Sequence, residues 1–438
     1  MALELDNTNH HLYMRVYQYY KDLILSGKLR AGTKMPSLRR CAQQLQISRT
    51  TVEAAYLLLA ADGYIISRAQ SGYYITDIAA KTPVHPSAKK ETAPAIRYDF
   101  ASSGVDRESF HFDVWRRYIK SALRQDERLL SYGSPQGEPE LRDVLCSYIH
   151  ERRNVICSPD DIVIGAGIQS LLHILCPLLS NRQTVSFPNP SFLQGISIFE
   201  DHGFQIRYRD KDSEIIYVSP AHMTKWGEIM PVSRRLELIR HAAQRQSLIL
   251  EDDYENEFVY MQRPTPSLQS LAAGQGVVYL GSFSRLLLPS IRLSFMVLPP
   301  DLSKSYQRIS GRYNQTASKM EQIALCQFIR DGHLASQIRR LRRLYSGKLK
   351  ELYQAVQSAF GANARIRVGS AGISLSLTLT CSLSGSAFLS LCAQNGIRVG
   401  LLQEQEKELE LILSCSSSPV SDFLPGCQAL FQVWQSTQ

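Results

Sequence analysis

This 438-residue chain lacks several common sequence signatures, and each absence excludes a class of protein or site. The nine cysteines are scattered without a C-x-x-C pair, so they indicate neither a zinc site nor a redox dithiol, and buried reduced thiols are expected. No apolar run approaches the roughly 20 residues of a membrane span. The start, Met1-Ala-Leu-Glu-Leu-Asp6, is acidic where a secretory signal is basic. We therefore expect a cytoplasmic protein of two or three domains, without a metal site.

Acidic side chains are also missing from one stretch near the N-terminus, although the whole chain has 40 of them beside 49 basic ones. From Lys28 to Arg49 there is no Asp or Glu. The basic residues of this interval are Lys28, Arg30, Lys34, Arg39, Arg40 and Arg49. A stretch of one charge sign is what neutralisation of nucleic-acid phosphates requires.

The same region has the pattern of a small domain. Apolar spacing predicts helices over 11–26 and 38–45, and Ser48 suits the N-cap of a third helix over 49–63. After this helix the period changes to two, which predicts a β-hairpin over 64–76. Three helices followed by a hairpin are the layout of a winged helix-turn-helix.

The expected DNA contacts lie at the start of the third helix and at the tip of the hairpin. The first residues of a recognition helix enter the major groove, where an arginine reads guanine or holds a phosphate. A glycine at the hairpin tip lets the backbone approach the duplex closely. The candidates are Arg49, Thr50, Thr51, Arg68, Ser71 and Gly72. Each arginine alone is as well explained as a solvated surface charge; the combination favours DNA binding.

This segment closely resembles the GntR-type winged helix. The resemblance lies in Leu29-Arg-Ala-Gly-Thr-Lys-Met-Pro-Ser-Leu-Arg39, in Ile47-Ser-Arg49-Thr-Thr-Val52 and in Ser71-Gly72. It implies a double-stranded DNA operator as partner, contacted through Arg39, Arg49, Thr50 and Gly72. Cys41 departs from the leucine usual in the family, and Ala69 stands where a basic residue or glycine is common.

The rest of the chain differs in character. Residues 78–97 contain three prolines and no periodicity, which predicts a solvated linker between a DNA-binding domain (8–77) and a second domain (98–438). In the second domain, short apolar runs alternate with helical patterns, which predicts an α/β fold with a mostly parallel sheet. The expected strands are 161–164, 184–187, 215–218, 247–250, 277–280 and 294–298. Long helices follow, and then a smaller α+β part from about Gly361.

One segment of this domain lacks the residue that its pattern leads us to expect. Gly281-Ser-Phe-Ser-Arg285-Leu-Leu-Leu-Pro-Ser-Ile-Arg292 resembles the cofactor-anchoring segment of pyridoxal-phosphate (PLP) enzymes of the aspartate-aminotransferase type. Such a segment carries a lysine where this chain has Arg285. A Schiff base needs an amine that can lose its proton, whereas a guanidinium stays protonated at physiological pH.

Other pieces of a fold-type I PLP site occur in the right order. Gly167 and Ile168 follow a strand and open a helix, so their N–H groups suit a phosphate. By the resemblance, Phe192 belongs to a segment that places an aromatic ring over the pyridine, Asp252 would pair with the pyridine nitrogen, and Tyr254 would reach the phenolic oxygen. The resemblance also implies that Ser282, Ser284 and Arg292 hold the phosphate. A polar closure of strand ends would explain one or two of these residues.

Winged helix and aminotransferase-like body together resemble the MocR/GabR subfamily of GntR-type regulators. The subfamily implies a PLP-responsive transcription factor that dimerises through its large domain. This chain departs from it at Arg285, in the segment Val218–Gly227, and in having no arginine after Arg398, where related enzymes clamp a substrate carboxylate. We therefore expect an inactive aminotransferase domain with no catalytic residue.

Three interpretations of the pocket remain open at this point. It holds PLP without a covalent bond, it holds another small anionic metabolite attracted by Arg285, or it is empty and the domain only dimerises. Two rival functions accompany them: a working aminotransferase with an accessory DNA-binding head, and a ligand-free dimeric DNA-binding protein.

Overall fold

A computed structural model describes residues 12–77, 95–101, 104–224, 226–259, 265–405 and 407–438. The chain divides into two compact units, Met1–Ala93 and Pro94–Gln438. Most of the predicted linker (78–94) lies outside the described residues. Its last residues belong to the larger unit, because the Arg97 N–H donates to the Gly396 carbonyl at 2.7 Å.

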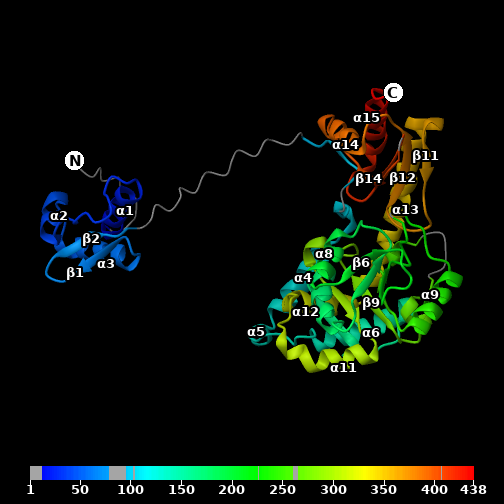
Figure 1. Ribbon diagram of the computed structural model, residues 1–438, viewed down its shortest axis with the longest axis horizontal. Coiled ribbons are helices and arrows are strands. Elements are labelled where there is room, and N and C mark those ends of the chain that lie inside the picture. The colour runs from blue at the N-terminus through cyan, green and yellow to red at the C-terminus, as the bar shows by residue number, and fades with distance from the viewer. Residues whose placement is uncertain (1–11, 78–94, 102–103, 225, 260–264, 406) are drawn as a thin grey trace. The chain divides into compact units, whose positions relative to one another are not determined.

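The smaller unit consists of three helices and a two-stranded hairpin (Figure 1). The elements are α1 (Leu12–Leu25), α2 (Leu38–Leu45), α3 (Arg49–Ala61), β1 (Ile65–Arg68) and β2 (Gly72–Ile75). Its core contains Tyr56, fully buried, whose hydroxyl donates to the Pro36 carbonyl at 3.1 Å. Cys41 is equally buried and lies 3.2 Å from the Tyr20 hydroxyl, so the departure from leucine at this position is accommodated inside the core.

A seven-stranded sheet forms the centre of the larger unit, in the order β4-β10-β9-β8-β7-β5-β6. All neighbours are parallel except β10, which is antiparallel to both β4 and β9. The strands are β4 (Ile162–Gly165), β5 (Thr184–Phe187), β6 (Gln205–Tyr208), β7 (Ile215–Val218), β8 (Leu248–Asp252), β9 (Val277–Ser282) and β10 (Ser294–Val297). The mostly parallel sheet was expected from the sequence; the edge strand β6 was not.

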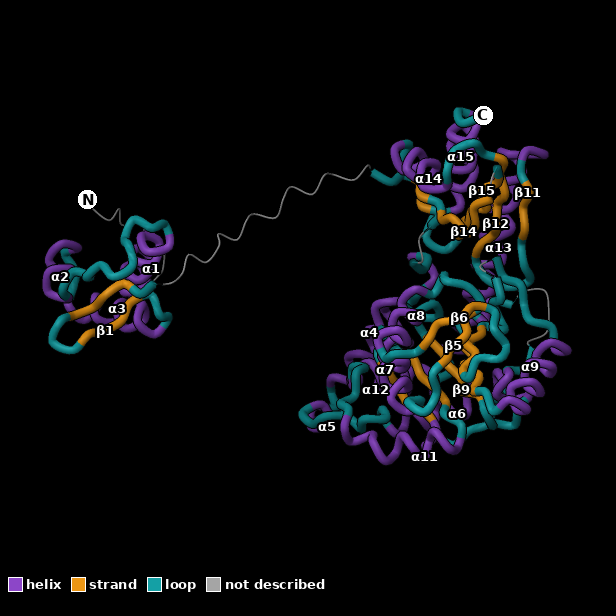
Figure 2. The backbone as a smooth tube through the Cα atoms, in the orientation of Figure 1, coloured by secondary structure: helices purple, strands orange, loops and turns teal. Residues whose placement is uncertain are grey.

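Helices cover both faces of this sheet, as Figure 2 shows. Successive side chains of a strand point to opposite faces, so Phe295 of β10 enters one core while Met296 enters the other. The first core also contains residues of α4 (Phe112–Leu123), α6 (Pro139–Arg153), α12 (Lys319–Arg330) and α13 (His333–Phe360). The second contains residues of α7 (Ile168–Leu178), α8 (Leu193–Asp201) and α11 (Pro300–Ile309). The short helices α5 (Asp126–Leu129) and α10 (Leu268–Leu271) and the longer α9 (Val232–Arg245) complete this part.

A second sheet lies in the C-terminal part, in the order β11-β12-β15-β14. Its strands are β11 (Arg365–Arg367), β12 (Ser374–Thr380), β14 (Gly400–Gln405) and β15 (Glu408–Ser414), all antiparallel to their neighbours. α14 (Gly385–Gln394) and α15 (Phe423–Gln435) lie beside it (Figure 2). The short strand β3 (Tyr98–Asp99), at the start of the larger unit, pairs with β13 (Ile397–Arg398).

Candidate DNA-binding surface and ligand cavity

The start of α3 is organised by its N-cap. The Ser48 hydroxyl accepts a hydrogen bond from the Thr51 N–H at 3.1 Å and lies 2.9 Å and 2.7 Å from the hydroxyls of Thr50 and Thr51. Arg49 and Thr50 are exposed, whereas Thr51 is partly covered. The predicted contacts at this helix start are therefore held together by one cap, with Arg49 free to extend outward.

The wing tip brings the other predicted contacts together. Arg68 ends β1 and stacks on the ring of Tyr74, with its guanidinium carbon 4.6 Å from the ring centroid. The Ser71 and Tyr74 hydroxyls lie 2.7 Å apart, and Gly72 opens β2 with a φ of +103°, a conformation that favours glycine. Arg39 is exposed on α2. Among the described residues no carboxylate lies within ion-pair distance of Arg39 or Arg68, so both charges are available to a polyanion.

At the carboxyl ends of the large sheet's strands lies a cavity of about 340 Å³. Five of the predicted ligand-binding residues line it, namely Ile168, Phe192, Asp252, Tyr254 and Ser282. This is the edge at which open α/β sheets bind ligands. The remaining four, Gly167, Ser284, Arg285 and Arg292, lie around it and are described below.

Two consecutive carboxylates at the end of β8 have different surroundings. Asp253 is fully engaged: its Oδ2 accepts from Arg153 Nε at 2.6 Å and from the Tyr279 hydroxyl at 2.7 Å, and its Oδ1 accepts from Arg153 Nη2 at 3.0 Å. Asp252 accepts one hydrogen bond, from the Tyr217 hydroxyl at 2.6 Å, on Oδ2. Its Oδ1 is buried and has no hydrogen-bond partner within the described structure. A buried oxygen without a partner is costly, so Asp252 is the carboxylate that a ligand would complete.

Burial raises the pKa of Asp252 to about 6, and the hydrogen bond from Tyr217 opposes that shift. A cationic N–H group against Oδ1 would favour the ionised form. The carboxylate therefore suits a ligand that carries a protonated ring nitrogen.

Aromatic rings form one wall of the cavity. Tyr217 lies between Phe187, at 4.9 Å between ring centroids, and Phe192, at 5.5 Å. Tyr254, two residues after Asp252, stacks on His222 with ring centroids 5.1 Å apart. These flat apolar surfaces around one carboxylate fit a planar heteroaromatic ring.

A cup of hydroxyl and N–H groups adjoins the cavity at the start of α7. Gly167 is the N-cap, and a side chain there would overlap the guanidinium of Arg292. Arg292 has a left-handed φ of +54°, a strained conformation for an arginine. The Ser282 hydroxyl lies 3.3 Å from that of Ser284 and 3.0 Å from that of Ser294. A helix N-terminus, an arginine and several hydroxyls together provide donors for a phosphate.

Arg285 is held by an ion pair that the sequence did not predict. Its Nε lies 3.1 Å from Glu255 Oε1, and Glu255 Oε2 lies 3.0 Å from His222 Nε2. Glu255 is buried and adopts a left-handed φ of +58°. Burial alone would raise the pKa of Glu255, but Arg285 and His222 lower it below its usual value. The guanidinium charge is thus balanced inside the protein.

Three residues of this site, Tyr217, His222 and Glu255, were not among the predicted contacts. His222 lies within the segment Val218–Gly227 and Glu255 directly follows Tyr254, but the residue types gave no sign of an ion pair. Tyr217 lies within the apolar strand β7, so the pattern indicated a core residue. Its hydroxyl partner follows from the parallel pairing of β7 with β8, which no local pattern reveals.

Within the described part of the chain there is no cluster of three or more His, Cys, Asp or Glu residues that could hold a metal. Nor is any described helix long and apolar enough to cross a membrane. Of the cysteines, Cys146 and Cys157 are partly exposed, with sulfur atoms 3.7 Å apart, and the other seven are buried.

Comparison with known proteins supports both halves of this description. Residues 12–75 match the bacterial regulatory proteins of the gntR family, and residues 99–399 match aminotransferase class I and II. The chain is 35% identical to the HTH-type transcriptional regulator YdeL of Bacillus subtilis, over 97% of each chain. It is 28% identical to the probable rhizopine catabolism regulatory protein MocR of Rhizobium meliloti, over 90% of this chain and 87% of the relative.

A solved structure of an archaeal alanine:glyoxylate aminotransferase shares the fold, with a TM-score of 0.71 and 21% identity. The match covers 80% of this chain and 93% of the aminotransferase. The predicted combination of a winged helix and an aminotransferase fold is confirmed.

Proposed function

The chain belongs to the bacterial regulators that join a gntR-family winged helix to an aminotransferase class I and II domain, and we propose that it senses PLP without a covalent bond. In this proposal it binds an operator in the cytoplasm as a homodimer, and ligand in the larger unit alters that binding. The observation that carries the ligand part is the free, buried Oδ1 of Asp252.

The DNA-binding half rests on the winged helix and its exposed cations. Arg49 at the start of α3 is placed to read a base edge or hold a phosphate, and Arg39 and Arg68 supply further phosphate contacts. Thr50, Thr51, Ser71 and Gly72 complete the surface that we assign to the operator. Two such units in a dimer would read two half-sites.

The ligand half rests on how well the cavity suits PLP. A protonated pyridine nitrogen would satisfy Asp252 Oδ1, the phosphate would lie among Gly167, Ile168, Ser282, Ser284 and Arg292, and Phe192 would cover the ring. The Tyr254 hydroxyl would donate to the phenolic oxygen.

Covalent attachment and turnover are not part of this proposal. Arg285 stands where we place the lysine of working relatives, and a guanidinium cannot form the imine. Where related enzymes clamp a substrate carboxylate, this chain has no arginine after Arg398, and β15 carries Glu408 and Glu410 instead. We infer a sensor that is not an enzyme.

The rival interpretations of the pocket fare less well. An anionic metabolite other than PLP, attracted by Arg285, is disfavoured because Glu255 already balances the charge of Arg285. An empty scaffold leaves Asp252 Oδ1 and the strained Arg292 unexplained. A working aminotransferase would need a lysine in place of Arg285.

A homodimer is supported by apolar side chains that no described residue covers. Leu130 and Tyr132, which follow α5, are 89% and 92% exposed. Large exposed apolar groups of this kind mark contact surfaces. Sedimentation should give a dimer mass, and a concentration-independent monomer would refute the dimer.

The purified protein's absorbance spectrum and thermal stability, with and without PLP, test the ligand proposal. A ligand that binds only the folded state raises the melting temperature by mass action. We expect a rise that dialysis reverses, with no covalently bound PLP. No rise would remove PLP as the ligand, and measurable transamination would restore the enzyme.

A further inference from the structure

The chain enters the larger unit through a segment that runs beside the ligand site. This entry segment, of which the structure describes residues 95–101 and 104–110, comes after the stretch that leads out of the winged helix. Its first residues are fixed by strand pairing of Tyr98–Asp99 with β13 and by a hydrogen bond from the Ser418 hydroxyl to the Asp99 carbonyl at 2.8 Å. Its later residues are fixed by contacts close to the cavity.

Arg285 makes the first of those contacts. Its Nη1 donates to the carbonyl of Gly104 at 3.4 Å, while its Nε pairs with Glu255. Glu255 directly follows Tyr254, which lines the cavity, and Ser284 directly precedes Arg285. One side chain therefore joins the rim of the cavity to the entry segment.

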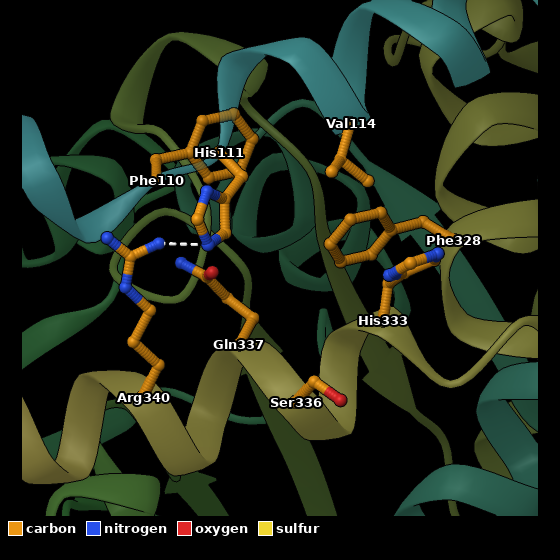
Figure 3. A pocket seen from close by; sticks show the side chains of 8 residues that line it. All are labelled: Phe110, His111, Val114, Phe328, His333, Ser336, Gln337 and Arg340. Atoms are coloured by element: carbon orange, nitrogen blue, oxygen red, sulfur yellow. Dashed lines mark hydrogen bonds between the residues drawn. The ribbon is translucent and has the colours of Figure 1, made fainter.

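Gln337 of α13 makes a second, parallel connection. Its buried Nε2 donates to the Ser109 carbonyl at 2.6 Å and lies 3.4 Å from the Leu286 carbonyl. Leu286 is the neighbour of Arg285 in the anchoring segment. Figure 3 shows Gln337 on α13 beside Arg340 and His111, the residue that follows the entry segment. These side chains line a small pocket of about 80 Å³, in which Arg340 is hydrogen-bonded to His111. The same two segments are thus tied at two successive places.

Further contacts hold the middle of the entry segment to α13. The Asp106 N–H donates to the Tyr345 hydroxyl at 3.1 Å, and the Asp106 carboxylate pairs with Lys348, a buried lysine. The segment is thus clamped between α13 and the anchoring segment. A displacement of either one must be taken up by it, because packed contacts deform little.

We propose that Arg285 and Gln337 are positioning residues that couple the ligand cavity to the entry segment, and through it to the chain leading to the DNA-binding unit. The inference rests on the proposed function, because it gives the route by which PLP would act. It also gives Arg285 a use of its own. A guanidinium has five donors in a fixed fork and bridges Glu255 and Gly104 at once, whereas a lysine engaged with a cofactor could not.

Hydrogen exchange of the full-length protein, with and without PLP, tests this coupling. We expect PLP to slow exchange of the amides of residues 105–109 by about tenfold, as binding raises the free energy of local opening. In Gln337→Leu, and in Arg285→Met/Glu255→Gln, we expect less than about a twofold change in the same amides. The double variant removes both partners of the ion pair and so leaves no unpaired buried charge.

The matched control is Arg182→Met. Arg182 also donates to carbonyl groups of the larger unit, those of Glu214 at 2.7 Å and Gln246 at 3.0 Å, but it lies outside the residues that line the cavity. It should keep the wild-type response. PLP-induced melting shifts on each variant verify that the ligand is bound. Equal protection in wild type and variants, or none in a wild type that binds PLP, overturns the coupling alone. Failure of PLP to bind at all overturns the proposed function with it.

Discussion

At the scale of single residues, the site depends on which of two adjacent carboxylates is left incomplete. The sequence has three consecutive acidic residues, Glu251-Asp252-Asp253, and the resemblance to PLP enzymes singles out Asp252. The sequence cannot show that Arg153 and Tyr279 both donate hydrogen bonds to Asp253, because those partners lie far away in the chain. The Glu255–Arg285 pair was hidden for the same reason. Residue types are readable from sequence, whereas pairings across the fold are not.

Asp252→Asn should abolish the PLP-induced rise in melting temperature. An amide can neither balance a pyridinium charge nor keep the hydrogen-bond pattern of the carboxylate. The loss should be at least about 1.5 kcal/mol of binding free energy, the size of a hydrogen bond to a charged group. Calorimetric titration with PLP measures it, and unchanged affinity in the variant would contradict the assignment of Oδ1.

The free energy of unfolding should depend on pH through the titration of Asp252. Because the pKa of Asp252 is raised from 3.8 to about 6 in the folded, ligand-free protein, the folded state binds a proton that the unfolded state has already lost. Its contribution therefore favours folding at low pH and is lost as the pH rises from about 4 through 6, by an amount on the order of 3 kcal/mol.

Denaturant titrations of wild type and Asp252→Asn between pH 4 and 7.5 check this, since the other buried carboxylates are common to both. The gap in free energy of unfolding between the two ligand-free proteins should change with pH. A gap that stays constant over this range would refute the raised pKa.

Arg49→Ala should weaken operator binding. A bidentate contact to guanine would cost about 1–3 kcal/mol, and a phosphate contact would also reduce the salt dependence by about one counterion. Arg116→Ala is the control, because that exposed arginine pairs with Asp113 on the larger unit. Fluorescence anisotropy over a salt series gives both quantities; affinity and salt slope equal to wild type would remove Arg49 from the contact surface.

At the scale of elements, periodicity was enough wherever a strand or helix has a buried face. The central strands of the large sheet are mostly apolar and were predicted close to their observed bounds. The edge strand β6 was missed because Arg207 and Tyr208 are exposed, which leaves no apolar run to recognise. Local patterns report burial, so elements at an edge escape them.

Close backbone approach is another feature that patterns do not show. Trp226 and Gly227 lie against the turn before β12, where the Gly369 N–H donates to the Trp226 carbonyl at 2.7 Å and the Ala371 N–H donates to the Gly227 carbonyl at 3.1 Å. Gly227 has a φ of +91°, and a Cβ there would overlap the Ala371 carbonyl. These contacts tie the His222 segment to the C-terminal sheet.

Gly227→Ala should therefore destabilise the larger unit by about 2 kcal/mol or more, from strain and steric overlap together. Gly311→Ala is the matched control, because no atom lies within 4 Å of its added Cβ and its φ is not positive. Thermal unfolding of the two variants, followed by their melting temperatures, tests this prediction. Equal melting temperatures would show that the segment can shift at little cost.

At the scale of the whole molecule, the chain joins two units whose separate roles follow from their families. The winged helix belongs to a DNA-binding family, and the aminotransferase fold supplies a cavity whose anchoring segment is tied to Gly104 of the entry segment. The sequence predicted both units and five of the twelve residues that line the cavity. The ties through Arg285 and Gln337 emerged only from the three-dimensional arrangement.

The most direct measurement is the operator affinity of the full-length protein with and without PLP, on a duplex selected from a random library, with Asp252→Asn alongside. The account predicts that PLP changes wild-type affinity by at least about fivefold, a coupling of about 1 kcal/mol, and that dialysis restores the original value. The variant should show no such change. Equal affinity with and without bound PLP in the wild type would contradict the account.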